Sequence, residues 1–143
     1  MLWREKKNVI KRKLLSSQYL MKKSKFKPVI PSLREKKRYL VFEVVSKGKV
    51  SFKQMYDSLN NALLGFLGQF GMAKAGVMIM EDKWDVNEQK GIIKLDNKSV
   101  DSVKSGLMFV NKIDGKDAIV KTLGLSGMIN KAESKFLIKN KGV

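Results

Sequence analysis

A dense cluster of cations leads directly into a strand-like segment at residues 33–45, and this junction most constrains what the chain folds into. Four cations lie within five residues: Arg34, Lys36, Lys37 and Arg38. The next seven residues, at positions 39–45, are β-branched or aromatic apart from Leu40 and Glu43, a composition typical of strands. A cation cluster fixed to a sheet holds a polyanion in a defined position. The junction therefore predicts a nucleic-acid-binding scaffold.

The positive charge of the chain is concentrated at its N-terminal end. The net charge is +17 over 143 residues. Residues 1–38 hold 14 basic and two acidic side chains, whereas residues 39–143 hold 16 and 11. A compact body with an intensely basic arm indicates a partner rich in phosphate, and an anionic membrane surface is the other candidate. About 6–10 lysine–phosphate contacts would dominate the affinity for a nucleic acid at moderate salt.

The residue types that are missing exclude most kinds of catalytic site. The chain contains no Cys and no His, which removes thiolate nucleophiles, zinc–thiolate sites and the usual general base near neutral pH. No apolar stretch approaches the ~20 residues that span a bilayer, and the N-terminal charge lacks the apolar segment of a signal peptide. We expect a cytoplasmic protein that is not itself catalytic and binds no cofactor.

The chain divides into a basic arm at residues 1–31 and an α/β domain at residues 32–143. Pro28 and Pro31 disfavour regular structure just before the domain. Within the arm, apolar residues at helical spacing allow a weak amphipathic helix that orders on a partner; these residues are Ile10, Leu14, Leu15 and Tyr19.

Apolar periodicity predicts an α+β fold for the domain. Strands are expected at residues 39–45, 77–80, 91–95 and 118–125, and helices are expected to begin after Ser51, after Ser99 and at residue 129. The first helix has a capping box in Ser51 and Gln54, and we expect Gly71 to end it. Its apolar stripe consists of Phe52, Met55, Tyr56, Leu59, Leu63, Phe66, Leu67 and Phe70. The order β-α-β-β-α-β predicts a ferredoxin-like, RRM-like sandwich, a four-stranded antiparallel sheet with two helices on one face and an extra C-terminal helix.

The second face of such a sheet is expected to be open to a partner. Lys90 and Gly91 begin like an RNA-stacking signature, but aliphatic residues follow where aromatic rings are required. Ile92 and Ile93 therefore favour a protein contact over base stacking. Trp84, in the polar loop at residues 81–89, is either an interface anchor or folded back onto the sheet.

Two glycine segments and an acidic loop are further candidate sites. The glycine-containing segments at residues 71–76 and 126–127 could bind phosphate through their backbone N–H groups, with Lys74, Lys131 and Lys135 nearby. Capping and chain reversal explain the same glycines without a ligand. The acidic loop lacks the central Gly and terminal Glu of a calcium site, so we expect a solvated loop and no metal; its carboxylates are Glu81, Asp82, Asp85 and Glu88.

The chain resembles the archaeal ribonuclease P protein component 2 family over residues 31–138. The resemblance lies in PSLREKKRY at residues 31–39, GMAKAG at 71–76, GIIK at 91–94 and LSGMI at 125–129. It implies a non-catalytic subunit that stabilises the catalytic domain of an RNA, which uses Mg²⁺ to remove the 5′ leader of precursor tRNA. It further implies pairing with protein component 3 and is compatible with self-association.

Two other functions remain open on the sequence. One is a different ribonucleoprotein accessory protein, for example of the ribosome or of RNA modification, which shares the charge but not the motifs. The other is a ligand-binding regulatory domain of the same topology, with residues 71–76 as its ligand loop. Such a domain has no need of the basic arm. We expect RNA contacts at Arg34, Lys36, Lys37 and Arg38, with Lys74, Lys131 and Lys135 next.

Overall fold

The computed structural model describes residues 5–9, 11 and 27–137 and divides the chain into two units, residues 1–34 and 35–143. In the first unit, residues 5–9 and 11 are helical, and Pro31–Leu33 forms a short 3₁₀ turn, η1. The Arg34 side chain donates a hydrogen bond from Nε to the Val29 carbonyl at 2.9 Å. The apolar positions of the expected amphipathic helix lie outside the described residues.

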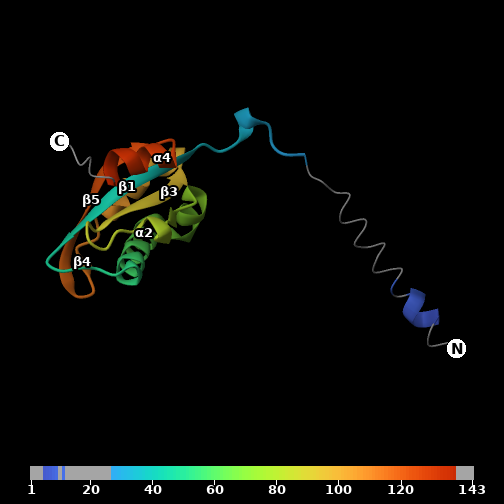
Figure 1. The fold of residues 1–143 in the computed structure, drawn as a ribbon, viewed down its shortest axis with the longest axis horizontal. Helices are drawn as coiled ribbons and strands as arrows, with labels where there is room; N and C mark the ends of the chain where they lie inside the picture. Colours follow the sequence, from blue (N-terminus) through green and yellow to red (C-terminus); the bar gives the residue numbers. More distant parts are fainter. Residues whose placement is uncertain (1–4, 10, 12–26, 138–143) are drawn as a thin grey trace. The chain divides into compact units, whose positions relative to one another are not determined.

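An antiparallel sheet of five strands forms the centre of the second unit (Figure 1). The strand order is β2-β3-β1-β5-β4. The strands are β1 (Lys37–Ser46), β2 (Met78–Ile79), β3 (Lys90–Asp96), β4 (Lys112–Ile113) and β5 (Lys116–Ser126). β1 lies in the middle, paired with β3 on one side and β5 on the other. The α+β class is confirmed, and each of the four expected strand segments contributes a strand.

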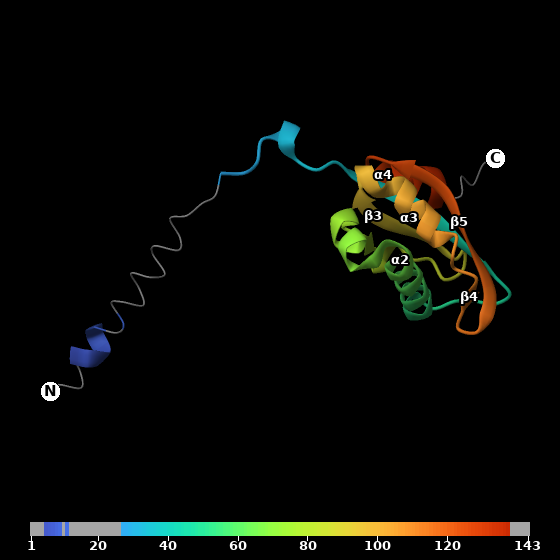
Figure 2. The ribbon, with the colours of Figure 1, turned by 180° about the vertical axis from the view of Figure 1, so that it is seen from behind.

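Helices cover both faces of the sheet. On one face lie α2 (Phe52–Ala75) and α3 (Val100–Leu107), and on the other lies α4 (Ile129–Ala132), as Figures 1 and 2 show. α4 continues into a π-helical turn, η4 (Glu133–Leu137). Two short 3₁₀ turns precede and follow β3, η2 (Glu81–Lys83) and η3 (Asn97–Ser99). Among the residues that the structure describes, no helix has the length and apolarity to cross a membrane.

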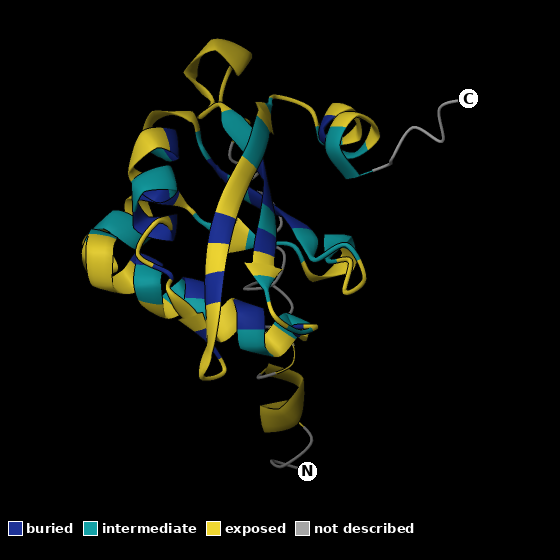
Figure 3. Ribbon diagram, turned by 90° about the vertical axis from the view of Figure 1, so that its left-hand side faces the viewer, coloured by how far each residue is buried: buried dark blue, intermediate teal, exposed yellow. Residues whose placement is uncertain are grey.

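The main core lies between the sheet and the pair α2–α3. Alternate residues of β1 point into it, and each fully buried aliphatic or aromatic side chain stabilises the fold by about 1.5–3 kcal/mol. Figure 3 shows these buried residues lining the interior. The largest fully buried side chains of this core are Phe42, Leu40, Met55, Leu59, Leu63, Ile93, Leu95, Leu107, Ile113 and Val103.

A second, smaller core closes the other face of the sheet, where the sequence predicted an open surface. Val41 and Ile92 are fully buried beneath Ala132 of α4, and Phe136 of η4 packs against them. The Phe136 ring lies directly over Gly124 of β5, where any Cβ would overlap it. The expectation of an open aliphatic face is wrong, because the missing side chain at Gly124 lets the C-terminal helix lie flat on the sheet.

α2 begins as predicted but ends later. The Ser51 hydroxyl accepts a hydrogen bond from the Gln54 amide while the Gln54 side chain accepts one from the Ser51 amide, which confirms the capping box. Gly71 does not end the helix, since it continues to Ala75 and is capped by Gly76 in the left-handed conformation (φ 56°). The helix is kinked at Gly68 (φ 72°, ψ 173°), a backbone conformation that favours glycine.

A fifth strand, β4, was not expected from the sequence. It forms a tight hairpin with β5 through Asp114 and Gly115, both with positive φ, as a two-residue type I′ turn requires. Asp followed by Gly is a turn signal in sequences, and here the pair forms the turn. The Gln54 amide group donates to the Asp114 carboxylate at 2.7 Å, which ties the hairpin to the start of α2.

Candidate nucleic-acid interface

The cation cluster enters the sheet at the start of its central strand. Lys37 and Arg38 pair with Asp96 and Leu95 of β3. One residue earlier, the Lys36 carbonyl accepts a hydrogen bond from the Asn97 amide at 2.9 Å. The backbone of residues 36–38 is thus held by hydrogen bonds to β3 and the turn that follows it. Three of the four predicted cations therefore project from fixed backbone positions.

Both cations at the start of β1 are oriented by local contacts. The Lys37 ammonium donates to the Glu35 carboxylate at 2.8 Å, and this hydrogen bond raises the pKa of Lys37 above its ordinary value of 10.5. Arg38 donates from Nη1 to the Lys37 carbonyl at 3.0 Å, which leaves its other guanidinium N–H groups available. Lys37 therefore stays charged at neutral pH with part of its charge balanced, while Arg38 has no carboxylate partner among the described residues.

The ends of the two glycine segments lie on either side of these cations. A Cβ at Gly76 would lie 3.8 Å from the Lys37 ammonium, and one at Gly127 would lie 3.5 Å from the Arg38 guanidinium. In both segments, backbone amides make hydrogen bonds within the chain, as capping and chain reversal require. Residues 71–75 are helical, and the Gly76 amide donates to the Met72 carbonyl at 3.1 Å. In the other segment, the Ser126 hydroxyl accepts from the Met128 amide at 3.2 Å.

The remaining predicted cations are exposed and lie on helices. Lys74 occupies the last turn of α2, two residues before Gly76, so the structure brings it to the helix end that approaches Lys37. Lys131 belongs to α4 and Lys135 to η4, on the face of the sheet that the second core closes. Lys135 lies 5.3 Å from the centre of the Phe136 ring, a cation–π distance.

Ile92 and Ile93, predicted to contact a protein partner, are both fully buried. Ile93 belongs to the main core and Ile92 to the second core, on opposite faces of β3. The structure leaves neither side chain a surface with which to contact another chain. Alternation along the strand explains the split, since α2–α3 and α4 each cover one face.

Trp84 folds back onto the sheet instead of projecting from the polar loop. Its ring stacks on Phe42 of β1 with the ring centres 6.0 Å apart. Gly91 makes room for this contact, because a Cβ there would lie 2.9 Å from Phe42 and 3.0 Å from Trp84. The Trp84 indole N–H is buried and has no hydrogen-bond partner among the described residues. Of the two alternatives left open for Trp84, the structure favours packing.

We expect Trp84→Phe to change the free energy of unfolding by less than about 1 kcal/mol, although it removes buried area. The substitution also removes an unpaired N–H whose burial costs about 1–3 kcal/mol. Trp84→Ala, which also loses the ring, should lower the free energy of unfolding by about 3 kcal/mol. Urea denaturation of both variants measures the difference. Equal losses in the two variants would contradict the packing role assigned to the ring.

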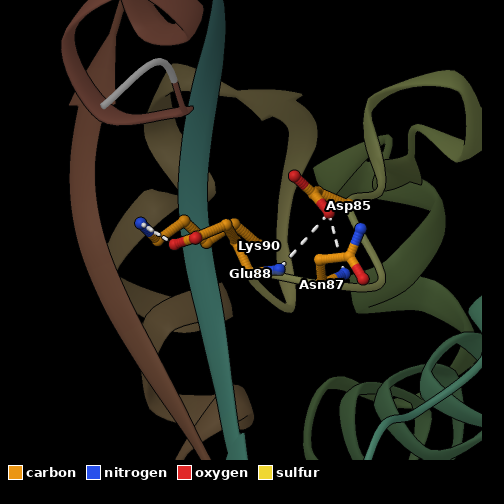
Figure 4. A network of polar contacts seen from close by, with 4 residues as sticks. All are labelled: Asp85, Asn87, Glu88 and Lys90. Atoms are coloured by element: carbon orange, nitrogen blue, oxygen red, sulfur yellow. Dashed lines mark hydrogen bonds and ion pairs between the residues drawn. The ribbon is translucent and has the colours of Figure 1, made fainter. Parts of the chain in front are cut away.

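The carboxylates of the polar loop are used within the chain. Asp85 accepts hydrogen bonds from the backbone amides of Asn87 and Glu88, at 2.8 and 3.3 Å, and Glu88 pairs with Lys90 at 3.4 Å (Figure 4). Lys83 of η2 pairs with Glu133 of η4 at 2.6 Å. Within the described residues, no three acidic side chains lie close enough together to hold a metal ion.

The Lys83–Glu133 pair ties the loop to the C-terminal helix, and its contribution should depend on pH. The hydrogen bond to Glu133 raises the pKa of Lys83 above 10.5. Stability from a raised lysine pKa is fully present below the unfolded-state value and is lost as the pH rises through the folded-state value. We therefore expect Lys83→Met to lower the melting temperature slightly at about pH 8, and the deficit to shrink above about pH 10.5. Calorimetry across this range measures it.

The matched control for Lys83→Met is Lys98→Met. Lys98 is exposed on η3 and makes no ion pair with a carboxylate of the described residues. At pH 8, Lys98→Met should lower the melting temperature less than Lys83→Met does. A Lys83→Met deficit of the same size at about pH 8 and pH 11 would show that the ion pair is not its cause.

The site brings cations together on a backbone held by hydrogen bonds. Positive side chains at one end of a rigid strand attract phosphate and fix its position. The cations could be identified from the sequence, but the proximity of Gly76 to Lys37 and of Gly127 to Arg38 could not. That proximity depends on where the C-terminal ends of α2 and β5 lie relative to β1. Its only signal in the sequence is the glycines themselves.

The chain has clear relatives among known proteins. Residues 38–137 match the model of the Rpp14/Pop5 family. Among similar curated proteins is ribonuclease P protein component 2 of Pyrococcus furiosus, 40% identical over 111 residues, which are 78% of this chain and 91% of the relative. The protein of the same name from Pyrococcus horikoshii is 35% identical over 115 residues, 80% and 94% of the two chains.

A solved structure gives the same fold from a more distant protein. A chain in the cryo-EM structure of yeast ribonuclease MRP superposes with a TM-score of 0.52 at 20% identity, covering 66% of this chain and 76% of its own. At this identity the likeness supports the fold alone. The family model spans most of the folded unit and begins at Arg38, within the cation cluster. The chain belongs to the Rpp14/Pop5 family.

Proposed function

We propose that this chain is a protein subunit of ribonuclease P that binds the RNA subunit and stabilises its catalytic domain. Family membership and the ribonuclease P name carried by its relatives support this assignment. The observation that carries it is the start of β1, where Lys36, Lys37 and Arg38 project from a backbone held in the sheet. Cations fixed in this way lower the repulsion between RNA phosphates that approach each other.

In this proposal the RNA subunit performs the chemistry. Mg²⁺ ions bound by the RNA would activate the hydrolysis that removes the 5′ leader of precursor tRNA. The chain contributes Arg34, Lys36, Lys37 and Arg38 as phosphate contacts, with Lys74, Lys131 and Lys135 as second contacts. Its protein partner would be component 3. The four strands expected from the sequence have the order β2-β3-β1-β5, which supports a ferredoxin-like topology. β4 adds a short hairpin strand at the β5 edge.

Purification of the chain from its own cell, followed by sequencing of the bound RNA, tests the proposal. We expect one RNA that, with Mg²⁺, cuts precursor tRNA at the mature 5′ end. Ribosomal RNA in its place would favour the alternative of another ribonucleoprotein accessory protein. The absence of bound RNA would contradict both and favour a regulatory domain.

A further inference from the structure

Several large apolar side chains are exposed on the α2–α3 side of the fold. Phe66 of α2 stacks on Phe109, which follows α3, with ring centres 5.1 Å apart. The two rings are nevertheless 46% and 64% exposed, and the neighbouring Met108 is 82% exposed. Exposed aromatic rings next to one another are rare on the surface of a soluble chain unless a partner covers them.

Two grooves flank this aromatic pair and extend the surface. The smaller groove, of about 250 Å³, is lined by Asn61, Ala62, Gly65, Phe66 and Phe109. The larger groove, of about 590 Å³, runs from Met108 to the ends of β1 and β5, where Val45 and Ile119 are exposed. Met108 and Phe109 are consecutive and line one groove each, so the two grooves are neighbours. We call the aromatic pair and the two grooves the aromatic surface.

The aromatic surface does not suit RNA. No charged residue occurs between positions 58 and 73 of α2 or between positions 105 and 111, although 30% of the chain is charged. A phosphate backbone requires cations, and its affinity is largely electrostatic. Large exposed apolar side chains are what protein–protein interfaces bury, at ~800 Å² from each partner of a stable complex.

The charges at the border of the aromatic surface indicate what kind of protein fits. Lys47 lines the larger groove, and the Lys116 ammonium lies beside the neighbouring Gly48, 3.5 Å from a Cβ built there. Lys112 lies across the β4–β5 pair from Asp117, the one carboxylate that lines this groove. None of the three lysines makes an ion pair with a carboxylate in the described part of the chain. A second copy would bring the same three lysines to the interface, where like charges would face one another.

We propose that the aromatic surface binds a different protein of the complex, through an apolar segment of that protein flanked by Asp or Glu. Apolar side chains of the partner would fill the two grooves, and its carboxylates would pair with Lys47, Lys112 and Lys116. The inference rests on the proposed function only in that the partner belongs to the same ribonucleoprotein. It moves the protein contact from the sheet face, where Ile92 and Ile93 are buried, to the helical side.

Site-specific crosslinking in the purified ribonucleoprotein tests this inference. The full chain carries the photoreactive amino acid benzoylphenylalanine at position 109 and, as a matched control, at Tyr56, an exposed aromatic residue of α2 outside both grooves. We expect position 109 to crosslink to a protein other than this chain, at a peptide that contains apolar residues flanked by Asp or Glu. The yield at position 56 should be at least tenfold lower.

A substitution gives the second readout. Met108→Ser combined with Phe109→Ser removes apolar area from exposed positions, and circular dichroism shows whether the fold is retained. We expect the double variant to retain its RNA while the amount of the crosslinked protein in the complex falls at least tenfold. A crosslink from position 109 to RNA or to a second copy, the absence of any crosslink, equal yields at the two positions or an unchanged amount of partner would each overturn the inference. A chain that carries no RNA contradicts the proposed function instead, whatever position 109 contacts.

Discussion

Gly124→Ala is expected to lower the free energy of unfolding by about 1–3 kcal/mol, the usual range for overpacking a core. The new methyl group would lie 2.5 Å from Cε1 of Phe136 and closer still to Cζ. The ring cannot remain over β5, so η4 and α4 must move away from Val41 and Ile92. Urea denaturation measures the loss, and protection of the Ala132 amide from hydrogen exchange reports whether α4 still lies on the sheet.

Two controls isolate the cause of this loss. Gly65→Ala places the same methyl group in α2 where no atom lies within 4 Å, so the stability should be unchanged or higher by up to about 1 kcal/mol. In a Phe136→Ala background the overlap no longer exists, and Gly124→Ala should cost little, a positive coupling between the two positions. Equal costs of Gly124→Ala with and without Phe136 would show that the ring is not what closes this face.

Replacing Arg34, Lys36, Lys37 and Arg38 together with alanine should weaken binding to the RNA by about 10- to 100-fold at 0.15 M salt. Each lost phosphate contact also removes about 0.7–0.9 from the slope of log K against log salt, so the slope should decrease by about 3. Filter binding between 0.05 and 0.4 M salt measures both quantities. The fold should survive, since no residue of this set is buried.

The matched control removes the same number of charges at the other end of β1. Lys47 and Lys49 follow that strand, and Lys112 and Lys116 flank the β4–β5 turn. Alanine at these four positions should leave the salt slope nearly unchanged, because a strand of ten residues separates them from Arg38 by about 30 Å, well beyond the Debye length. A slope that falls equally in both variants would mean that total charge, and not its position, determines affinity.

Features set by neighbouring residues could be predicted from the sequence. The alternation at residues 39–45 became the centre of β1, Ser51 and Gln54 formed their capping box, and Asp114 with Gly115 formed the hairpin turn. Each of these depends on side chains within a few positions of one another, so the local chemistry suffices.

Features set by distant packing could not be predicted. The periodicity of α2 places Phe66 and Phe70 in one apolar stripe with its buried residues, but Phe66 is half-exposed and Phe70 is 82% exposed. The kink at Gly68, between these two residues, changes the direction in which the side chains after it point. The spacing of apolar residues before the kink does not predict this change. The cover over the second face likewise depends on Phe136 meeting Gly124, residues from two different elements.

The candidate site divides in the same way. The cations of residues 34–38 could be identified from their density alone, and the ladder with β3 then explains why three of them have fixed backbones. The protein contact was assigned to Ile92 and Ile93, which are buried. The sequence of an aliphatic strand does not show whether one face of its sheet or both faces are covered.

Cleavage of precursor tRNA as a function of Mg²⁺ concentration tests most directly whether this chain supplies fixed positive charge while RNA breaks the bond. The purified chain, freed of nucleic acid, should release no 5′ leader at any Mg²⁺ concentration. Added with its protein partner to the RNA subunit, it should lower the Mg²⁺ concentration needed for half-maximal cleavage, and the alanine variant of residues 34 and 36–38 should not. Leader release by the chain alone, or an equal Mg²⁺ requirement with the variant and with the wild type, would contradict the account.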